Sequence, residues 1–114
     1  MISTDLIRAF LIMILYNTTI NIDEDVHEQW LGWMKSFYIP LLMQTGYFVD
    51  KKLLQILDEE ANGGVTYCLQ LFLNEKEDFE EYQKKFYPSH FDLFNKKYHN
   101  KYVNFTTLLN VLEE

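Results

Sequence analysis

Alternation of apolar and polar residues is the clearest pattern in the chain, and it is strongest in residues 63–73, GGVTYCLQLFL. The odd-numbered positions from 65 to 73 are all apolar, whereas positions 66, 68 and 70 carry threonine, cysteine and glutamine. Such alternation is typical of a strand that has one face on a core and the other in a more polar environment. Residues 14–22 and 102–112 alternate in the same way, and a further strand is predicted over roughly 47–57.

Two helices are predicted from apolar positions that recur every three or four residues, at 26–41 and 79–98. In the first, Asp23 is the expected N-cap, and Pro40 is expected to end or bend the helix near Ile39. The second is expected to have an N-cap at Asn74, with Glu77 at the reciprocal position, and to be interrupted at Pro88.

The order strand, helix, strand, strand, helix, strand predicts an α+β fold of the ferredoxin-like βαββαβ type. Right-handed crossovers place the first and third strands at the centre of a four-stranded antiparallel sheet, with both helices on one face. The charged segment DEEANGG at 58–64 predicts a hairpin between the second and third strands. We expect residues 13–114 to form one domain and residues 1–12 to be an N-terminal extension.

Composition narrows the classes of partner. The chain has 114 residues, a formal charge of −7 and one cysteine, Cys68. The negative charge disfavours nucleic acid and anionic membranes as partners. The apolar run at the N-terminus is too short to span a bilayer and contains Arg8. A lone cysteine forms no intramolecular disulfide, which predicts a cytoplasmic location.

The sheet face that the helices leave uncovered is the predicted functional surface. On the fourth strand the apolar residues Val103, Phe105, Leu109 and Val111 are expected in the core, which leaves Asn104, Thr106 and Asn110 on the open face. Together with the polar positions of the first and third strands, this alternation predicts that a ligand site contains Asn17, Thr19, Thr66, Cys68, Gln70 and Thr106.

The same face is expected to carry Phe72, with Phe48 and Ile56 beside it. Soluble monomers avoid large exposed apolar patches, so the sequence predicts a homodimer paired through this face. Because polar residues lie there too, water or a polar small molecule is expected between the two sheets.

Other chemical signals are weak. His27, His90 and His99 have no metal-ligand spacing among themselves or with Cys68, so no metal site and no cofactor are predicted. His27 is expected to point to solvent. Clusters of carboxylates occur where helices start and chains turn, which explains them without catalysis.

Three segments, YIPLLMQTGYF, GGVTYCLQLF and VNFTTLL, resemble a family of short bacterial proteins known as a domain of unknown function and grouped with the dimeric α+β barrels. Trp30 and Met34 precede them, and the resemblance runs from about Met13 to Leu112. It implies a ferredoxin-like subunit whose open sheet pairs with a second copy, and it implies no established reaction. Members of that family often carry histidine where this chain has Tyr38 and Tyr87.

Two classes of function follow from this reading. The first is a non-catalytic homodimer that binds a small molecule or a protein partner at the open sheet face. The alternative is a small cofactor-free enzyme of the oxygenase, isomerase or decarboxylase type, as found among dimeric α+β barrels. An ionisable group buried in the open-face site would favour the enzyme.

Overall fold

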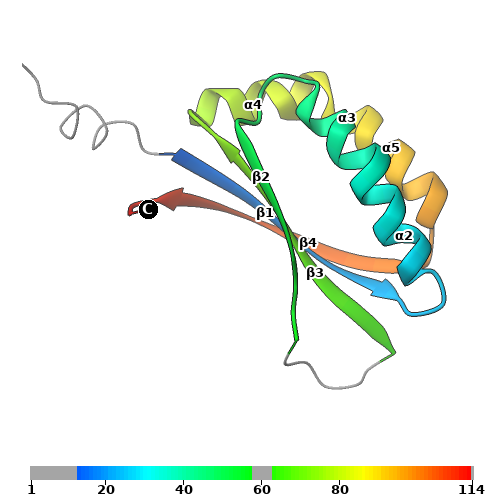
Figure 1. The fold of residues 1–114 in the computed structure, drawn as a ribbon. Coiled ribbons are helices and arrows are strands. Elements are labelled where there is room, and N and C mark those ends of the chain that lie inside the picture. The colour runs from blue at the N-terminus through cyan, green and yellow to red at the C-terminus, as the bar shows by residue number, and fades with distance from the viewer. Residues whose placement is uncertain (1–12, 58–62, 114) are drawn as a thin grey trace, which may run out of the picture.

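The computed structural model describes residues 13–57 and 63–113, and these form a four-stranded antiparallel sheet with helices on one side (Figure 1). The strands lie in the order β2-β3-β1-β4. Their bounds are β1 Met13–Asp23, β2 Asp50–Gln55, β3 Gly64–Leu73 and β4 Tyr102–Val111. The predicted βαββαβ order and the central position of the first and third strands are confirmed. β2 is shorter than expected.

Two predictions lie outside the described residues. One is the N-terminal extension over residues 1–12, and the other is most of the turn predicted over 58–64, of which residues 58–62 lie outside. β2 and β3 are nevertheless antiparallel partners, with Asp50 opposite Phe72 and Gln55 opposite Tyr67, as a hairpin requires.

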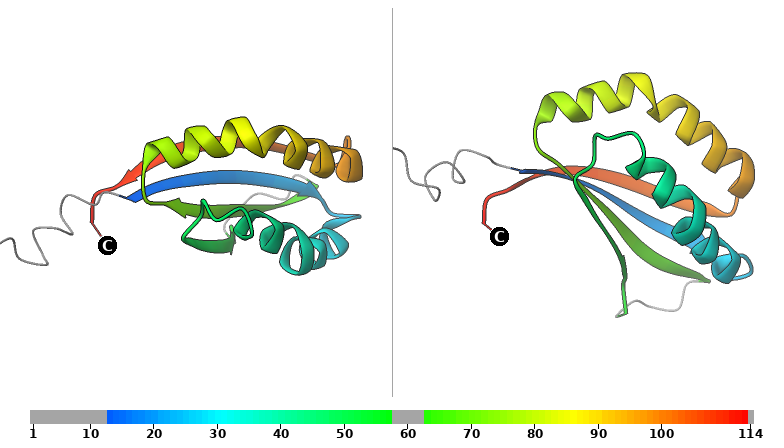
Figure 2. Two further views of the ribbon diagram at one scale, coloured as in Figure 1. Left: turned by 90° about the horizontal axis from the view of Figure 1, so that it is seen from above. Right: turned by 45° about the horizontal axis from the view of Figure 1, so that its top comes forward.

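The helices form a single layer on one face of the sheet, as the views in Figure 2 show. The first helical segment consists of α2 (His27–Trp33), the π-helical turn η1 (Met34–Tyr38) and α3 (Ile39–Met43). The second consists of α4 (Lys76–Lys85) and α5 (Tyr87–Tyr98), and its break next to Pro88 is confirmed. Among the described residues, no helix has the length and apolar character needed to cross a membrane.

Pro40 does not end the first helical segment, which continues to Met43. A proline has no N–H to donate, and its ring crowds the carbonyl four residues earlier. The π-helical turn ends at Tyr38, two residues before Pro40, and at its end the N–H of Ile39 donates to the carbonyl oxygen of Met34, five residues back. This wider turn allows the helix to pass the proline.

Both predicted N-caps are wrong. Asp23 is the last residue of β1, and α2 starts after Val26 without a side-chain capping bond. α4 starts one residue later than expected, after Glu75, whose side chain also makes no capping hydrogen bond within the described chain. Asn74 therefore lies outside the capping position, because extended backbone continues through Glu75.

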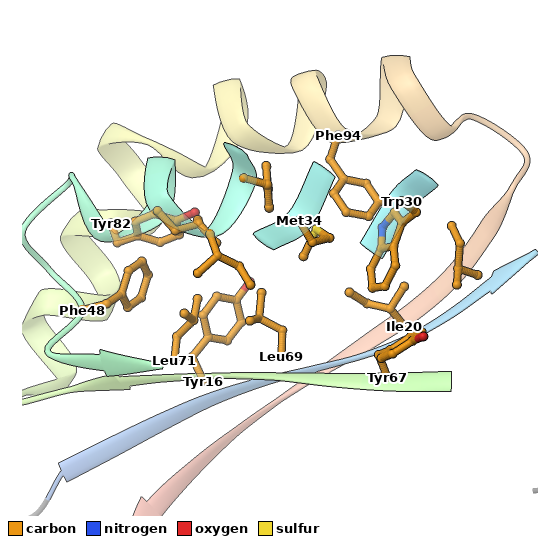
Figure 3. Close-up of a cluster of buried hydrophobic side chains, with 14 of the residues drawn as sticks. Tyr16, Ile20, Trp30, Met34, Phe48, Tyr67, Leu69, Leu71, Tyr82 and Phe94 are labelled. Carbon is orange, nitrogen blue, oxygen red and sulfur yellow. The ribbon is translucent and has the colours of Figure 1, made fainter. Parts of the chain in front are cut away.

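The core fills the space between the helix layer and the sheet (Figure 3). Trp30 and Met34 reach it from the first helical segment and are fully buried. The apolar side of β3, which includes Leu69 and Leu71, forms its floor. The alternation in β3 therefore places its apolar residues under the helices, as predicted, and its other side on the open face.

Candidate functional site

The open face of the sheet is the side without helices, and it carries most of the residues predicted to form a site. The register pairs Asn17 with Gln70, Thr19 with Cys68 and Asn21 with Thr66. Directly opposed residues of antiparallel strands point to the same face. The two central strands thus bring six polar or weakly polar side chains together, and we call this set the polar centre: Asn17, Thr19, Asn21, Thr66, Cys68 and Gln70.

Hydrogen bonds already order part of the polar centre. Nδ2 of Asn21 donates to Oγ1 of Thr66 at 3.0 Å, and Nδ2 of Asn17 donates to Oγ1 of Thr19 at 3.2 Å. Oγ1 of Thr19 also lies 3.8 Å from Sγ of Cys68. By contrast, the side chain of Gln70 makes no hydrogen bond to another described residue.

Thr106 is the one predicted site residue that lies on the wrong face. It is opposite Thr18 of β1, whose neighbours Tyr16 and Ile20 are buried under the helices. Thr106 therefore points to the helix side, as do Asn104 and Asn110. The residues expected in the core, Val103, Phe105, Leu109 and Val111, instead lie on the open face.

This reversal gives the polar centre an apolar frame. On the β4 side, Val103 and Phe105 leave 69% and 63% of their surfaces exposed. On the β2 side, Leu54 lies opposite Cys68 and is also exposed. Further apolar residues of the open face are Leu15, Ile56, Phe72, Leu109 and Val111.

Phe72 and Ile56 lie on the open face as expected, but Phe48 does not. Its side chain is buried on the helix side, where its ring lies 4.7 Å from that of Tyr82 in an edge-to-face contact (Figure 3). Phe48 precedes β2, so the alternation of that strand does not extend to it.

A second feature, which the sequence did not indicate, is a pocket of about 60 Å³ on the other side of the sheet, between β1, β4 and the helices. We call it the helix-side pocket. Thr18 and Thr106 contribute to its floor, and Met34 and Phe94 contribute to its helical wall. Five tyrosines line it: Tyr16, Tyr38, Tyr82, Tyr87 and Tyr102.

His90 lies behind the tyrosines of the helix-side pocket. Its Nδ1 is 2.8 Å from the hydroxyl of Tyr82, and its backbone carbonyl accepts a hydrogen bond from the hydroxyl of Tyr38 at 3.3 Å. Burial lowers the pKa of His90 and raises the pKa values of Tyr38 and Tyr82. All three groups are therefore neutral near pH 7. The sequence reading missed His90 because a lone histidine at an i, i+8 spacing from a tyrosine has no recognisable pattern.

His27 does not point freely to solvent, contrary to the prediction. Its Nε2 lies 2.6 Å from the hydroxyl of Tyr67, and the two rings stack with centroids 5.8 Å apart. The contact joins the first turn of α2 to β3, on the opposite side of the sheet from the polar centre, because Tyr67 lies on the helix side. Within the described residues, no three histidine, cysteine or carboxylate side chains are grouped so that they could hold a metal ion.

The fold is shared with solved structures at low sequence identity. A dimeric ferredoxin-like protein from an uncultured marine organism aligns with a TM-score of 0.63 and 11% identity, covering 90% of this chain and 98% of that one. A protein described as a putative antibiotic biosynthesis monooxygenase from Bacillus cereus aligns with a TM-score of 0.62 and 9% identity, covering 90% and 96%. At these identities the likeness shows the fold and no activity.

Comparison with curated proteins finds no match. A family model does match, over residues 13–112, which is nearly the whole chain and includes all four strands and both helical segments. This chain therefore belongs to the family described as domain of unknown function (DUF4286).

Proposed function

We propose that this protein is a homodimer in which two open faces pack together and enclose the polar centre as a binding site for a small polar molecule. The observation that carries this proposal is the arrangement of the open face, where exposed apolar residues frame six central polar side chains. The frame is suited to exclude water at the rim, and the centre is suited to hydrogen bonding.

The apolar frame supports self-association. Phe105 and Val103 are exposed in the single chain, together with Leu54, Ile56 and Leu109. Contiguous apolar patches of this kind mark interfaces. A twofold axis through the open face would use the same patch on both copies, which is the commonest form of homo-oligomer. One ferredoxin-like structural neighbour is described as dimeric, which supports self-association of this fold.

The polar centre supports binding between the two sheets. When a second sheet covers the open face, Gln70 and the side-chain oxygens of Asn17 and Asn21, which accept no hydrogen bond from another described residue, leave bulk water. A buried polar group without a partner costs about 1–3 kcal/mol. Water or a polar ligand bound there supplies those partners.

The residue types of the polar centre favour binding over catalysis. None of the six carries a carboxylate, an imidazole or an ammonium group, and the thiol of Cys68 is the one side chain among them of a type that commonly transfers protons in enzymes. The charged residues Asp50 and Lys52 lie on the open face, but at the exposed edge strand β2.

A cytoplasmic location remains a prediction that rests on the lone thiol of Cys68.

Sedimentation velocity at micromolar concentration tests the dimer. The wild type is expected to sediment as a dimer, and Phe105→Asp is expected to shift it to a monomer because the substitution places a charge in the apolar frame. Leu93→Asp is the matched control, since Leu93 is similarly apolar and exposed but lies on α5, in the helix layer. A monomeric wild type contradicts the proposal.

Mass spectrometry of small molecules that co-purify with the native protein tests the polar centre. Gln70→Leu is expected to keep the dimer and to lose any such molecule, because it removes the side chain with unused hydrogen-bonding groups. Retention of the molecule by Gln70→Leu, together with its loss from a variant on the other side of the sheet such as Thr18→Leu, would place the ligand elsewhere.

A further inference from the structure

The helix-side pocket is separate from the polar centre and lies within one subunit. Thr18 lines the pocket, and its neighbour in sequence, Thr19, belongs to the polar centre on the opposite side of the sheet. On β4, Thr106 lines the pocket, and the next residue, Thr107, lies on the open face. The pocket therefore does not depend on dimer formation, and a ligand bound there would be additional to the proposed function.

The lining of the pocket is aromatic and uncharged. Five tyrosines contribute to it, together with Phe91 and Phe94, and none of the lining residues is acidic or basic. Aromatic faces and edges attract a further ring through offset or edge-to-face contacts worth about 0.5–1.5 kcal/mol beyond simple burial. An anion would find no counter-charge in this pocket, so its burial would be unfavourable.

Two tyrosine hydroxyl groups of the pocket already donate their protons within the protein, but their oxygen atoms can still accept hydrogen bonds. Tyr38 donates to the backbone of His90, and Tyr102 donates to Oδ1 of Asn95 at 2.9 Å. Their oxygen atoms still have lone pairs available. Asn104 and Thr106 have exposed side chains that make no hydrogen bond to another described residue, so they add both donors and acceptors.

The size of the pocket limits what enters it. A closed cavity of roughly 150 Å³ holds benzene, whereas the helix-side pocket has about 60 Å³. A single ring therefore enters part of the way, and the rest of the molecule lies at the mouth. The exposed lining residues mark that mouth: Phe91, Asn104 and Thr106.

We propose that the helix-side pocket binds a small uncharged molecule with one aromatic ring and a hydroxyl or carbonyl group. The ring packs among the tyrosines and next to Met34, and its polar group lies at the mouth within reach of Asn104 and Thr106. The proposal assigns no reaction to the pocket.

Benzamide and benzoate are matched probes, because they share ring and shape and differ in charge near pH 7. Saturation-transfer NMR with the full chain is expected to detect benzamide with a dissociation constant on the order of 1 mM, as suits so few atoms. Benzoate is expected to bind at least about tenfold more weakly, because its carboxylate loses part of its hydration at the mouth and no lining residue carries a positive charge to compensate. Equal binding of the two probes, or no binding of benzamide, would overturn the proposal.

Two pairs of adjacent threonines locate the site. Thr18→Leu and Thr106→Leu place larger side chains in the pocket and are expected to abolish benzamide binding. Thr19→Leu and Thr107→Leu make the same change on the open face and are expected to leave binding within twofold of the wild type. The reverse pattern would place the probe on the open face and overturn the proposal.

Nuclear Overhauser contacts provide a readout that does not depend on any variant folding correctly. Benzamide ring protons are expected to show contacts to the methyl group of Met34, whereas contacts to the ring of Phe72 on the open face would contradict the proposed site. Binding is also expected to persist in Phe105→Asp, even if that variant is monomeric. Failure of the dimer proposal and failure of the pocket proposal therefore give different results.

Discussion

The hydroxyl of Tyr82 and Nδ1 of His90 lie 2.8 Å apart, and both side chains are buried where α4 meets α5. The pair spans the helix break at Phe86, because Tyr82 is on α4 and His90 is on α5. It therefore holds the two halves of the second helical segment together and fixes the helical wall of the helix-side pocket at that point.

Removing the Tyr82 hydroxyl should destabilise the fold. Tyr82→Phe leaves Nδ1 of His90 buried without its partner, which is expected to lower the free energy of unfolding by about 1–3 kcal/mol. Urea denaturation followed by circular dichroism measures the change. Tyr47→Phe is the matched control, since the Tyr47 hydroxyl contacts the exposed Lys85, and this variant is expected to match the wild type. If Tyr82→Phe were as stable as Tyr47→Phe, the hydrogen bond between Tyr82 and His90 would contribute nothing to the stability of the fold.

The stability of the protein should fall in mild acid because of His90. Burial lowers the pKa of His90 below its ordinary value of 6.5, so the unfolded chain binds a proton more readily than the folded one. The stabilisation from the neutral imidazole is complete above about pH 6.5 and is lost as the pH falls through the folded-state pKa.

Thermal unfolding of the wild type and His90→Gln between pH 8 and pH 4.5 checks this dependence. Both proteins lose stability in acid through their carboxyl groups, so the informative quantity is the difference between them. We expect the wild type to be the more stable at pH 8 and the difference to shrink below pH 6.5. A difference that stays constant over the whole range would rule out a role for His90 titration.

Two glycines should respond in opposite directions to the same substitution. A Cβ atom added to Gly64 would clash with the side chain of Asn21, whose Cγ would lie 2.8 Å away, and the Asn21–Thr66 hydrogen bond would have to break. Gly64→Ala is therefore expected to destabilise the protein by about 0.5–1.5 kcal/mol. At Gly32, within α2, an added Cβ meets no atom within 4 Å.

Gly32→Ala is accordingly expected to stabilise the protein by about 0.5–1 kcal/mol, because alanine loses less backbone entropy than glycine in a helix. Chemical denaturation of the two variants side by side measures both effects. If Gly64→Ala were as stable as the wild type, the packing of Asn21 against Gly64 would be unimportant for the order of the polar centre.

We predict that residues 13–114 fold as a domain without residues 1–12. β1 begins at Met13 and pairs with both neighbours along its length, from Met13 opposite Val111 to Asp23 opposite Gly64. A chain that starts at Met13 is expected to keep a cooperative thermal transition within about 5 °C of the full chain, equivalent to a change of roughly 1 kcal/mol. Loss of that transition would show that the N-terminal segment is structural.

The sequence determined which side of β3 faces the helices. Side chains of a strand alternate with a period of two, and every odd position from Val65 to Leu73 is apolar, so just one register puts that row in the core. Because β1 pairs with β3, the placement of Asn17 and Thr19 on the open face followed as well. The element order was sufficient for the ferredoxin-like fold, since strand pairing and crossover handedness leave few other topologies.

The faces of β4 depended on the tertiary structure. Its apolar row, with Phe105 at the centre, was expected in the core, but the pairing of Tyr16 with Leu108 and Ile20 with Asn104 turns that row to the open face. Alternation shows that a strand has one apolar side, but it does not show whether the chain's own helices or another surface covers that side. Thr106 was misplaced for this reason.

The helix-side pocket and its histidine also depended on the tertiary structure. Tyr82 and His90 come together because the helix breaks between them, and Thr18 and Thr106 meet because β4 pairs with β1 across 88 residues of sequence. Contacts of this kind arise from the angle at which α4 meets α5 and from the depth to which each side chain packs. The spacing of residues along the sequence predicts neither quantity, because periodicity depends on local geometry. A pocket forms where several packed elements leave space between them, which is a property of the tertiary structure.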